Sequence, residues 1–157
     1  HERGEIKETE FYAHMRNTLS LETSDDAIIA GWNRLLVEPF DETVQVISKI
    51  NRRIPCYGLS NTNRTHILEM ERRFEAVLGL FAKPYLSADM GMRKPESAIF
   101  EAVCAGIGES PENILFFDDS PINIDAAQAL GFQSVLVKES ADVHRAINGV
   151  INIESEA

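Results

Sequence analysis

Two adjacent acidic residues, Asp118 and Asp119, follow the apolar run Ile114–Phe117. Four consecutive apolar residues predict a strand that is buried on both faces. Ser120 and Pro121 then favour the start of a helix directly after the acids. Ligands of open α/β sheets bind at the carboxyl ends of the strands. Two carboxylates at that place can hold a cation or exchange a proton; the alternative is a polar loop in which Asp119 caps the helix.

Two further polar stretches follow apolar segments. Ser60 and Asn61 come after the predicted strand Ile54–Leu59, and a hydroxyl, a side-chain amide and free backbone N–H groups can bind phosphate oxygens. The segment Gly91–Pro95 places Lys94 directly before a proline that we expect to open a helix. Taken singly, these stretches are compatible with an Asn-rich turn and a solvated lysine. Together with the two acids at one sheet edge, they predict an anion cradle, a fixed cation and a pair of metal-binding carboxylates.

The elements that must position these groups alternate between strand and helix after Pro39. Such alternation predicts an α/β fold with a parallel sheet and helices on both faces. Before Pro39, two helical patterns follow one another without a strand, and the second has Ser24 as its cap. We therefore expect a helical unit at 1–38 and a core at 39–157. The strands are expected at 54–59, 85–87, 114–117 and 134–137, and the polar tail beyond them is expected to fray.

Composition narrows the function class. The chain has 157 residues, 44% of them hydrophobic, and a formal net charge of −10. Without a basic stripe, this charge argues against nucleic acid as a partner, although a metal and one lysine can still bind an anionic substrate locally. No apolar run approaches the length of a membrane span. Cys56 and Cys104 lie among apolar residues, which suggests buried thiols in a reducing compartment and hence a cytoplasmic location. Two cysteines are weak evidence for a disulfide.

Three segments of the chain resemble the haloacid dehalogenase superfamily. Gly58–Asn61, Gly91–Pro95 and Phe117–Asp119 are similar, in order and spacing, to the second, third and fourth motifs of that family. Within it, the chain resembles the small sugar-phosphatase branch typified by bacterial α-D-glucose-1-phosphate phosphatase. The resemblance implies a Rossmann-like core at 39–157 and the carboxyl-terminal part of a helical cap at 1–38.

The activity implied by this resemblance is a Mg²⁺-dependent phosphatase that acts on a small phosphorylated metabolite, for example a sugar phosphate. An aspartate would attack phosphorus, and water would hydrolyse the aspartyl-phosphate. Carried over residue by residue, Ser60 and Asn61 would bind the phosphoryl oxygens, and Lys94 would neutralise the nucleophile and the phosphoryl charge. Positioning and charge neutralisation of this kind are what phosphoryl transfer needs most.

The resemblance also implies a magnesium site. Asp119 would bind Mg²⁺ directly, Asp118 would act through a metal-bound water, and Asn123 would hold the loop in place. Mg²⁺ prefers oxygen ligands, keeps several waters, and binds through one or two carboxylates together with the phosphate.

One motif of the family does not occur in this chain. No Asp-x-Asp follows an apolar strand, although that motif supplies the nucleophile and the general acid/base. Since it precedes the cap, we expect it on a preceding segment of roughly 40 residues, enough for a strand, its loop and part of the cap. Without that central strand, the chain alone is expected to be inactive and poorly stable. A retained N-terminal peptide, a dimer or a rearranged sheet could compensate.

Other readings of the same residues stay open at this point. The first is a non-catalytic binding or regulatory module that keeps the fold but has lost the first motif. A receiver-like signalling domain also uses paired acids and a lysine, but its acids lie on its first strand and it has no helical cap. Dehalogenase chemistry needs no metal, and the pair Asp118-Asp119 argues against it.

Overall fold

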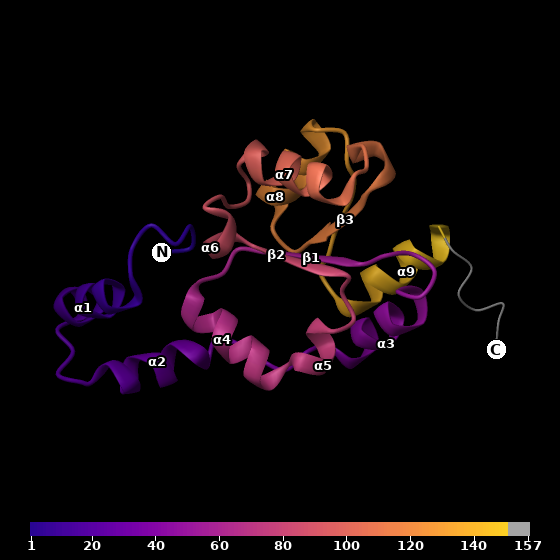
Figure 1. The fold of residues 1–157 in the computed structure, drawn as a ribbon. Helices are drawn as coiled ribbons and strands as arrows, with labels where there is room; N and C mark the ends of the chain where they lie inside the picture. The colour runs from indigo at the N-terminus through magenta and orange to yellow at the C-terminus, as the bar shows by residue number, and fades with distance from the viewer. Residues whose placement is uncertain (151–157) are drawn as a thin grey trace.

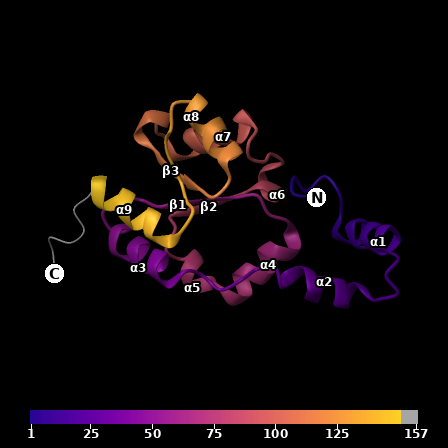
Figure 2. The same ribbon diagram turned by 180° about the vertical axis from the view of Figure 1, so that it is seen from behind.

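The computed structural model describes residues 1–150 and shows helices on both sides of short parallel strands (Figures 1 and 2). The strands are β1 (Tyr57–Ser60), β2 (Lys83–Leu86), β3 (Leu115–Asp118) and β4 (Gln133–Leu136). The helices are α1 (Glu8–Leu19), α2 (Asp25–Asn33), α3 (Asp41–Ile50), α4 (Arg64–Arg73), α5 (Glu75–Leu78), α6 (Ser87–Met90), α7 (Ser97–Ile107), η1 (Pro111–Asn113), α8 (Pro121–Ala129) and α9 (Ser140–Val150).

The strands form two separate parallel pairs. β1 pairs with β2 in a register that runs from Tyr57 opposite Lys83 to Ser60 opposite Leu86. β3 pairs with β4, with Asp118 opposite Leu136 at the carboxyl end. Within residues 1–150, β1 and β3 are not hydrogen-bonded neighbours. The α/β class and the parallel pairing are confirmed, but the single continuous sheet that the sequence suggests is instead divided between β1 and β3.

The main core lies where α7 and α8 cover one side of the strands, as Figure 1 shows. Phe100 of α7 is completely buried and meets Phe116 of β3 edge-on, with 5.5 Å between the ring centroids. Phe132, just before β4, packs against both rings. Leu59 of β1 contacts the same core, so this cluster joins the two strand pairs through side chains where backbone hydrogen bonds are absent.

A second, smaller core lies on the opposite side of β3, between α3 and α9. Val46 and Ile50 of α3 pack against Val143 and Ile147 of α9, and Phe117 of β3 contacts this cluster. The expectation of a fraying tail beyond the last strand is therefore wrong for Ser140–Val150. The spacing of Val143 and Ile147, one helical turn apart, is the sequence signal for this helix. The remainder of the tail lies outside the described residues.

Several element boundaries differ from the sequence-based expectations. Pro95 does not open the next helix, because α7 begins at Ser97 with Glu96 at its N-cap position. The first strand begins at Tyr57, three residues later than expected, and includes Ser60. Ser87 was expected at the end of a strand and residues 88–94 in a loop, but Ser87–Met90 form the helical turn α6. The helix start at Pro121 is confirmed.

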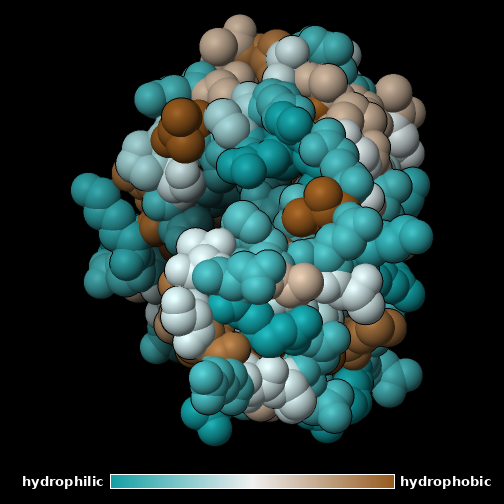
Figure 3. All heavy atoms as spheres, turned by 90° about the vertical axis from the view of Figure 1, so that its left-hand side faces the viewer, coloured by the Kyte–Doolittle hydropathy of each residue, from teal (hydrophilic) through white to brown (hydrophobic). Residues whose placement is uncertain are grey.

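The two N-terminal helices, α1 and α2, lie at one end of the molecule beside α4 (Figures 1 and 2). The Ser24 hydroxyl accepts a hydrogen bond from the Ala27 N–H, which confirms the predicted cap. Tyr12 and Ile28 are the buried residues of these helices. Figure 3 views the molecule from this end and shows a mostly hydrophilic face with scattered hydrophobic groups. No helix within residues 1–150 is long and apolar enough to cross a membrane.

Gly106 allows α7 to lie against β2. A Cβ at this position would be 2.5 Å from the Tyr85 hydroxyl and 3.2 Å from the ring carbon Cζ, and Tyr85 is buried. We expect Gly106→Ala to lower the free energy of unfolding by about 1–3 kcal/mol through overpacking, although alanine is the better helix former. Urea unfolding followed by circular dichroism measures this change.

The matched control is Gly31→Ala in α2, because nothing lies within 4 Å of the added Cβ and Gly31 is exposed. This substitution should raise stability by about 0.5–1 kcal/mol. A stabilising effect of Gly106→Ala similar to that of the control would contradict the packing argument.

Candidate active site

Lys94 joins the carboxyl ends of β1 and β3. Its Nζ donates hydrogen bonds to Asp118 Oδ2 at 2.6 Å and to the Leu59 carbonyl at 2.9 Å. The Lys94 side chain is only 10% exposed and that of Asp118 only 4%. The paired carboxylate fixes the position of the buried ammonium at the place where the two strand pairs meet. The structure thus brings together the predicted cation and the first predicted acid.

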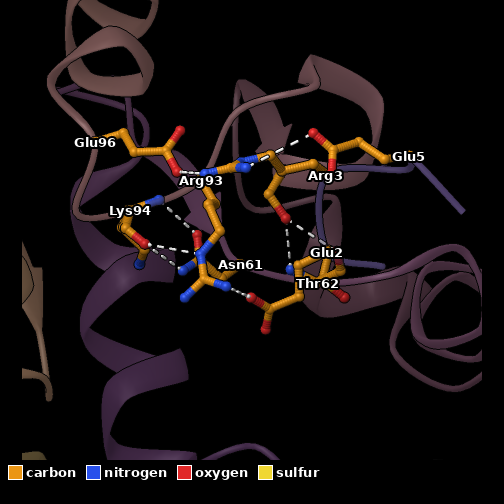
Figure 4. Close-up of polar contacts among 9 residues, drawn as sticks. Glu2, Arg3, Glu5, Asn61, Thr62, Arg93, Lys94 and Glu96 are labelled. Carbon is orange, nitrogen blue, oxygen red and sulfur yellow. Dashed lines mark hydrogen bonds and ion pairs between the residues drawn. The ribbon is translucent and has the colours of Figure 1, made fainter.

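Asn61 holds the backbone of Lys94 from the end of β1. Its Nδ2 donates to the Lys94 carbonyl at 2.9 Å, and its Oδ1 accepts from the Lys94 N–H at 2.8 Å (Figure 4). The Asn61 side chain therefore positions the backbone of Lys94. The amide nitrogen has a second hydrogen and the residue has a backbone N–H, so the contact of Asn61 with a phosphoryl oxygen stays a prediction.

Ser60 is the last residue of β1 and is half-buried. Among residues 1–150, its hydroxyl has no hydrogen-bond partner, so it is available to an anion next to Lys94. The next turn is held from the first residue of α6: the buried Ser87 hydroxyl accepts from the Thr62 N–H at 2.8 Å and donates to the Thr62 carbonyl at 2.9 Å. Ser87 was not singled out in the sequence, although it directly follows a strand.

The two acids at the end of β3 differ in their surroundings. Asp118 Oδ1 accepts from the Ser120 N–H at 2.8 Å and from Asn123 Nδ2 at 2.9 Å, while Oδ2 accepts from Lys94. Asn123 therefore holds the loop as expected. Asp119 is exposed at the same edge. Asp119 is the acid with oxygens open to a metal, and Asp118 is held by protein donors.

The side chains at this sheet edge can be compared with the ligands that a metal ion needs. Within the described residues, no group of three or more His, Cys, Asp or Glu side chains could hold a metal ion. An exposed carboxylate beside a second acid fits Mg²⁺, which binds through one or two carboxylates, waters and phosphate oxygens. The residues present therefore fit one part of a magnesium site, and further oxygen ligands would have to come from substrate, water or another segment.

Asp118 is held in its ionised form by its partners. Burial alone would raise the pKa of this carboxyl, but hydrogen bonds from Lys94, Asn123 and the Ser120 N–H, together with the Lys94 charge, lower its pKa below the ordinary value. A carboxyl whose folded-state pKa is lowered contributes stability above its unfolded pKa of about 4, and this contribution is lost as the pH falls through the folded-state pKa.

We expect Asp118→Asn to lower the free energy of unfolding at pH 7 by about 2 kcal/mol, the scale of hydrogen bonds to charged groups. The difference from the parent protein should shrink below about pH 4, where the carboxyl is protonated in the unfolded chain. Urea unfolding at pH 7 and below about pH 4 measures this difference in the free energy of unfolding. Asp119→Asn, at an exposed site, should stay within about 0.5 kcal/mol of the parent. Equal losses in the two variants would show that the Lys94–Asp118 contact does not stabilise the fold.

Charged residues that the sequence analysis did not single out surround the Lys94 loop. Arg93 Nη1 lies 3.0 Å from Glu2 Oε2, and Arg3 forms an ion pair with Glu96 (Figure 4). The N-terminal segment thus lies against the candidate site. Its only signal in the sequence is a run of alternating charges.

An apolar pocket of about 340 Å³ lies elsewhere, between α1 and α2, where it is lined by Met15, Leu21, Trp32 and Leu35 among others. It shares no residue with the cluster around Lys94. We therefore assign the chemistry to the sheet edge and not to this pocket.

Comparison with known proteins identifies the family. Residues 5–131 match the haloacid dehalogenase-like hydrolases. The chain belongs to this family. The matched region includes all the predicted site residues, from Ser60 to Asp119. The expected family is thus confirmed, while the narrower likeness to the glucose-1-phosphate phosphatase branch stays a prediction.

Two curated relatives of this family member are phosphatases. Sesquiterpene phosphatase astK of Aspergillus oryzae is 26% identical, over 88% of this chain and 71% of that protein. D-ribitol-5-phosphate phosphatase of Bacteroides thetaiotaomicron is 24% identical, over 96% and 76%. Drimenol cyclase drtB of Aspergillus calidoustus is 30% identical over 99% of this chain, which spans only 30% of the cyclase.

Solved structures of the family share the fold. A HAD family enzyme from Bacteroides thetaiotaomicron, in complex with magnesium and inorganic phosphate, superposes with a TM-score of 0.80 and 35% identity, over 87% of this chain and 72% of that one. A predicted HAD-like family hydrolase from Porphyromonas gingivalis has a TM-score of 0.80 and 28% identity, over 99% and 77%. These likenesses confirm the HAD-like core as the fold. The separate roles of Ser60, Asn61, Lys94, Asp118 and Asp119 stay predictions.

Proposed function

We propose that this chain forms the phosphate- and metal-binding part of a Mg²⁺-dependent phosphatase that acts on a small phosphorylated metabolite. The observation that carries the proposal is the bridge from Lys94 Nζ to Asp118 Oδ2 and the Leu59 carbonyl. It holds a positive charge at the sheet edge, beside the free Ser60 hydroxyl and the exposed Asp119. The magnesium and phosphate complex of the Bacteroides thetaiotaomicron relative supports this assignment.

In this proposal, each residue has a separate task. The Lys94 ammonium neutralises charge on the phosphoryl group, and Asn61 and Asp118 keep the ammonium in position. The Ser60 hydroxyl donates a hydrogen bond to a phosphoryl oxygen. Mg²⁺, held in part by Asp119, would supply further charge neutralisation when bound. Fixed positive charge and oriented donors are the main protein contributions to phosphoryl transfer.

We also propose that the nucleophile is an aspartate on a segment outside this chain. The edges of β1 and β3 that face away from their partners are unpaired within residues 1–150. A parallel strand between them would join the two pairs into one sheet and place its carboxyl end beside Lys94. Both phosphatase relatives are longer than the region that this chain covers.

A sugar phosphate is the finer substrate that we propose. Its support is the resemblance to sugar phosphatases together with the D-ribitol-5-phosphate phosphatase among the relatives. The sesquiterpene phosphatase also supports hydrolysis of a phosphate ester, but the organic group in its name is a terpenoid and not a sugar.

The test is phosphate release by the full-length protein, with p-nitrophenyl phosphate and with panels of sugar and terpenoid phosphates, in Mg²⁺ and in EDTA. Intact mass under denaturing conditions first establishes which segments the sample contains. We expect Mg²⁺-dependent release only when the segment with the nucleophile is present. Phosphate binding without release by the full-length protein would instead favour a binding module, and would overturn the proposal.

A further inference from the structure

Residues Glu2–Glu5, here called the N-terminal strap, lie across the loop that carries Lys94 (Figure 4). Glu2 pairs with Arg93 at 3.0 Å, and Arg3 pairs with Glu96. The acid of the strap, Glu2, thus pairs with the base of the loop, and the base of the strap, Arg3, pairs with the acid of the loop. The two ion pairs therefore contact the loop on both sides of Lys94 and Pro95.

The strap also passes close to the backbone of α6. Gly4 has a φ of +67°, and a Cβ on this residue would lie 2.6 Å from the Ala88 carbonyl oxygen. Only glycine tolerates both the left-handed backbone and this close approach. The views in Figures 1 and 2 agree that the N-terminus lies beside α6. The strap is thus held at the carboxyl ends of β1 and β2, where the candidate site lies.

The strap also continues into the two N-terminal helices. The ring of His1, directly before the strap, stacks on Phe11 of α1 with 3.8 Å between centroids. Phe11 meets Trp32 of α2 edge-on at 5.1 Å, and Trp32 stacks on His66 of α4 at 5.5 Å. These ring contacts connect the strap to both N-terminal helices and to α4.

We propose that the strap is a salt-sensitive latch between the N-terminal helices and the core, in which Arg93 and Glu96 act as positioning residues for Lys94. The effect of the latch on catalysis rests on the proposed function, whereas the contact between the strap and the loop does not depend on it. The paired side chains are between 36% and 45% exposed. Exposed pairs are individually weak and screened by salt, so salt should weaken the contact between the strap and the loop.

Charge reversal tests the latch in the full-length protein. The variants are Arg3→Glu, Glu96→Arg and the double variant that exchanges the two charges; Glu101→Arg, exposed on α7, is the matched control. The reporters are the hydrogen-bonded amides of Gly91, Lys94 and Glu96 in hydrogen exchange. Trp32, the single tryptophan of the chain, reports on the helices by fluorescence.

We expect each single reversal to speed exchange at these amides about fivefold and the double variant to restore the parent rate, because a broken exposed pair changes an equilibrium on that scale. The control variant Glu101→Arg should leave the exchange rate of these amides unchanged. Raising salt from about 0.1 M to about 1 M, which shortens the screening length from about 10 to 3 Å, should speed exchange in the parent and shift Trp32 emission.

Unchanged exchange in both single variants, or no rescue in the double variant, would overturn the latch. Hydrogen exchange and fluorescence are measured without turnover. They therefore test whether the latch exists even if the protein releases no phosphate. If it does release phosphate, the single reversals should also lower kcat, and the double variant should recover it. Loss of activity in the singles without rescue would contradict the positioning role.

Discussion

We expect Lys94→Met to reduce Mg²⁺-dependent phosphate release by the full-length protein at least about 100-fold, the scale seen when one preorganised electrostatic group is removed. Methionine keeps the apolar stem of the side chain but removes the ammonium that contacts Asp118 and the Leu59 carbonyl. A positive charge at the phosphoryl group is then lost, while Ser60 and Asp119 remain. Steady-state kinetics with p-nitrophenyl phosphate measures the loss.

The same substitution leaves Asp118 buried and without its cation, so it should also destabilise the fold by about 3–5 kcal/mol. The double variant Lys94→Met with Asp118→Asn removes both charges and should regain most of this stability without regaining activity. Lys83→Met, at an exposed lysine of β2, is the matched control and should leave turnover unchanged. Near-normal activity in a folded double variant would remove Lys94 from the proposed machinery.

Phe100→Ala should lower the free energy of unfolding by about 3–5 kcal/mol. Phe100 is completely buried, and its ring meets Phe116 and Phe132 at centroid distances of 5.5 and 5.6 Å. Because this cluster joins the two strand pairs where hydrogen bonds do not, the cavity left by the ring weakens both at once. Urea unfolding measures the loss.

Phe40→Ala is the control for Phe100→Ala, since Phe40 is 70% exposed at the start of α3. It removes the same group from a site where little burial is lost, and should change stability by less than about 0.5 kcal/mol. Similar losses in both variants would show that the aromatic cluster does not hold the strand pairs together.

The residues of the site could be predicted because Ser60 and Asp118 lie at the carboxyl ends of strands and Lys94 lies in a loop between them in sequence. Ser60, Lys94 and Asp118 are far apart in the chain, yet parallel strands bring their carboxyl ends to one edge. The direct 2.6 Å contact between Lys94 and Asp118 was not predicted, because the sequence indicates only that both residues lie at the same sheet edge. The role of the Asn61 side chain was not predictable, because pairing with the Lys94 backbone depends on the tertiary approach of two loops.

Other features depend on packing that local patterns do not carry. The division of the strands into two pairs follows from edge pairing, which no strand segment encodes by itself. Glu2 and Arg3 lie about ninety residues from their partners on the Lys94 loop and look like ordinary surface charges in the sequence. In contrast, α9 was missed although Val143 and Ile147 are spaced one turn apart, because the surrounding polar residues outweighed a short signal.

The two cores each contain one cysteine, which makes them chemically distinguishable. Cys104 packs against the Phe100 cluster, and Cys56 packs against the cluster between α3 and α9. Both thiols are free, and burial raises the pKa of each. Because thiolate is the reactive species, the raised pKa slows alkylation of both half-buried thiols, and opening of a core should speed the reaction of the cysteine that packs against it. Pulsed alkylation with mass spectrometry would therefore time the opening of the two faces of β3 separately, in one experiment and without added labels.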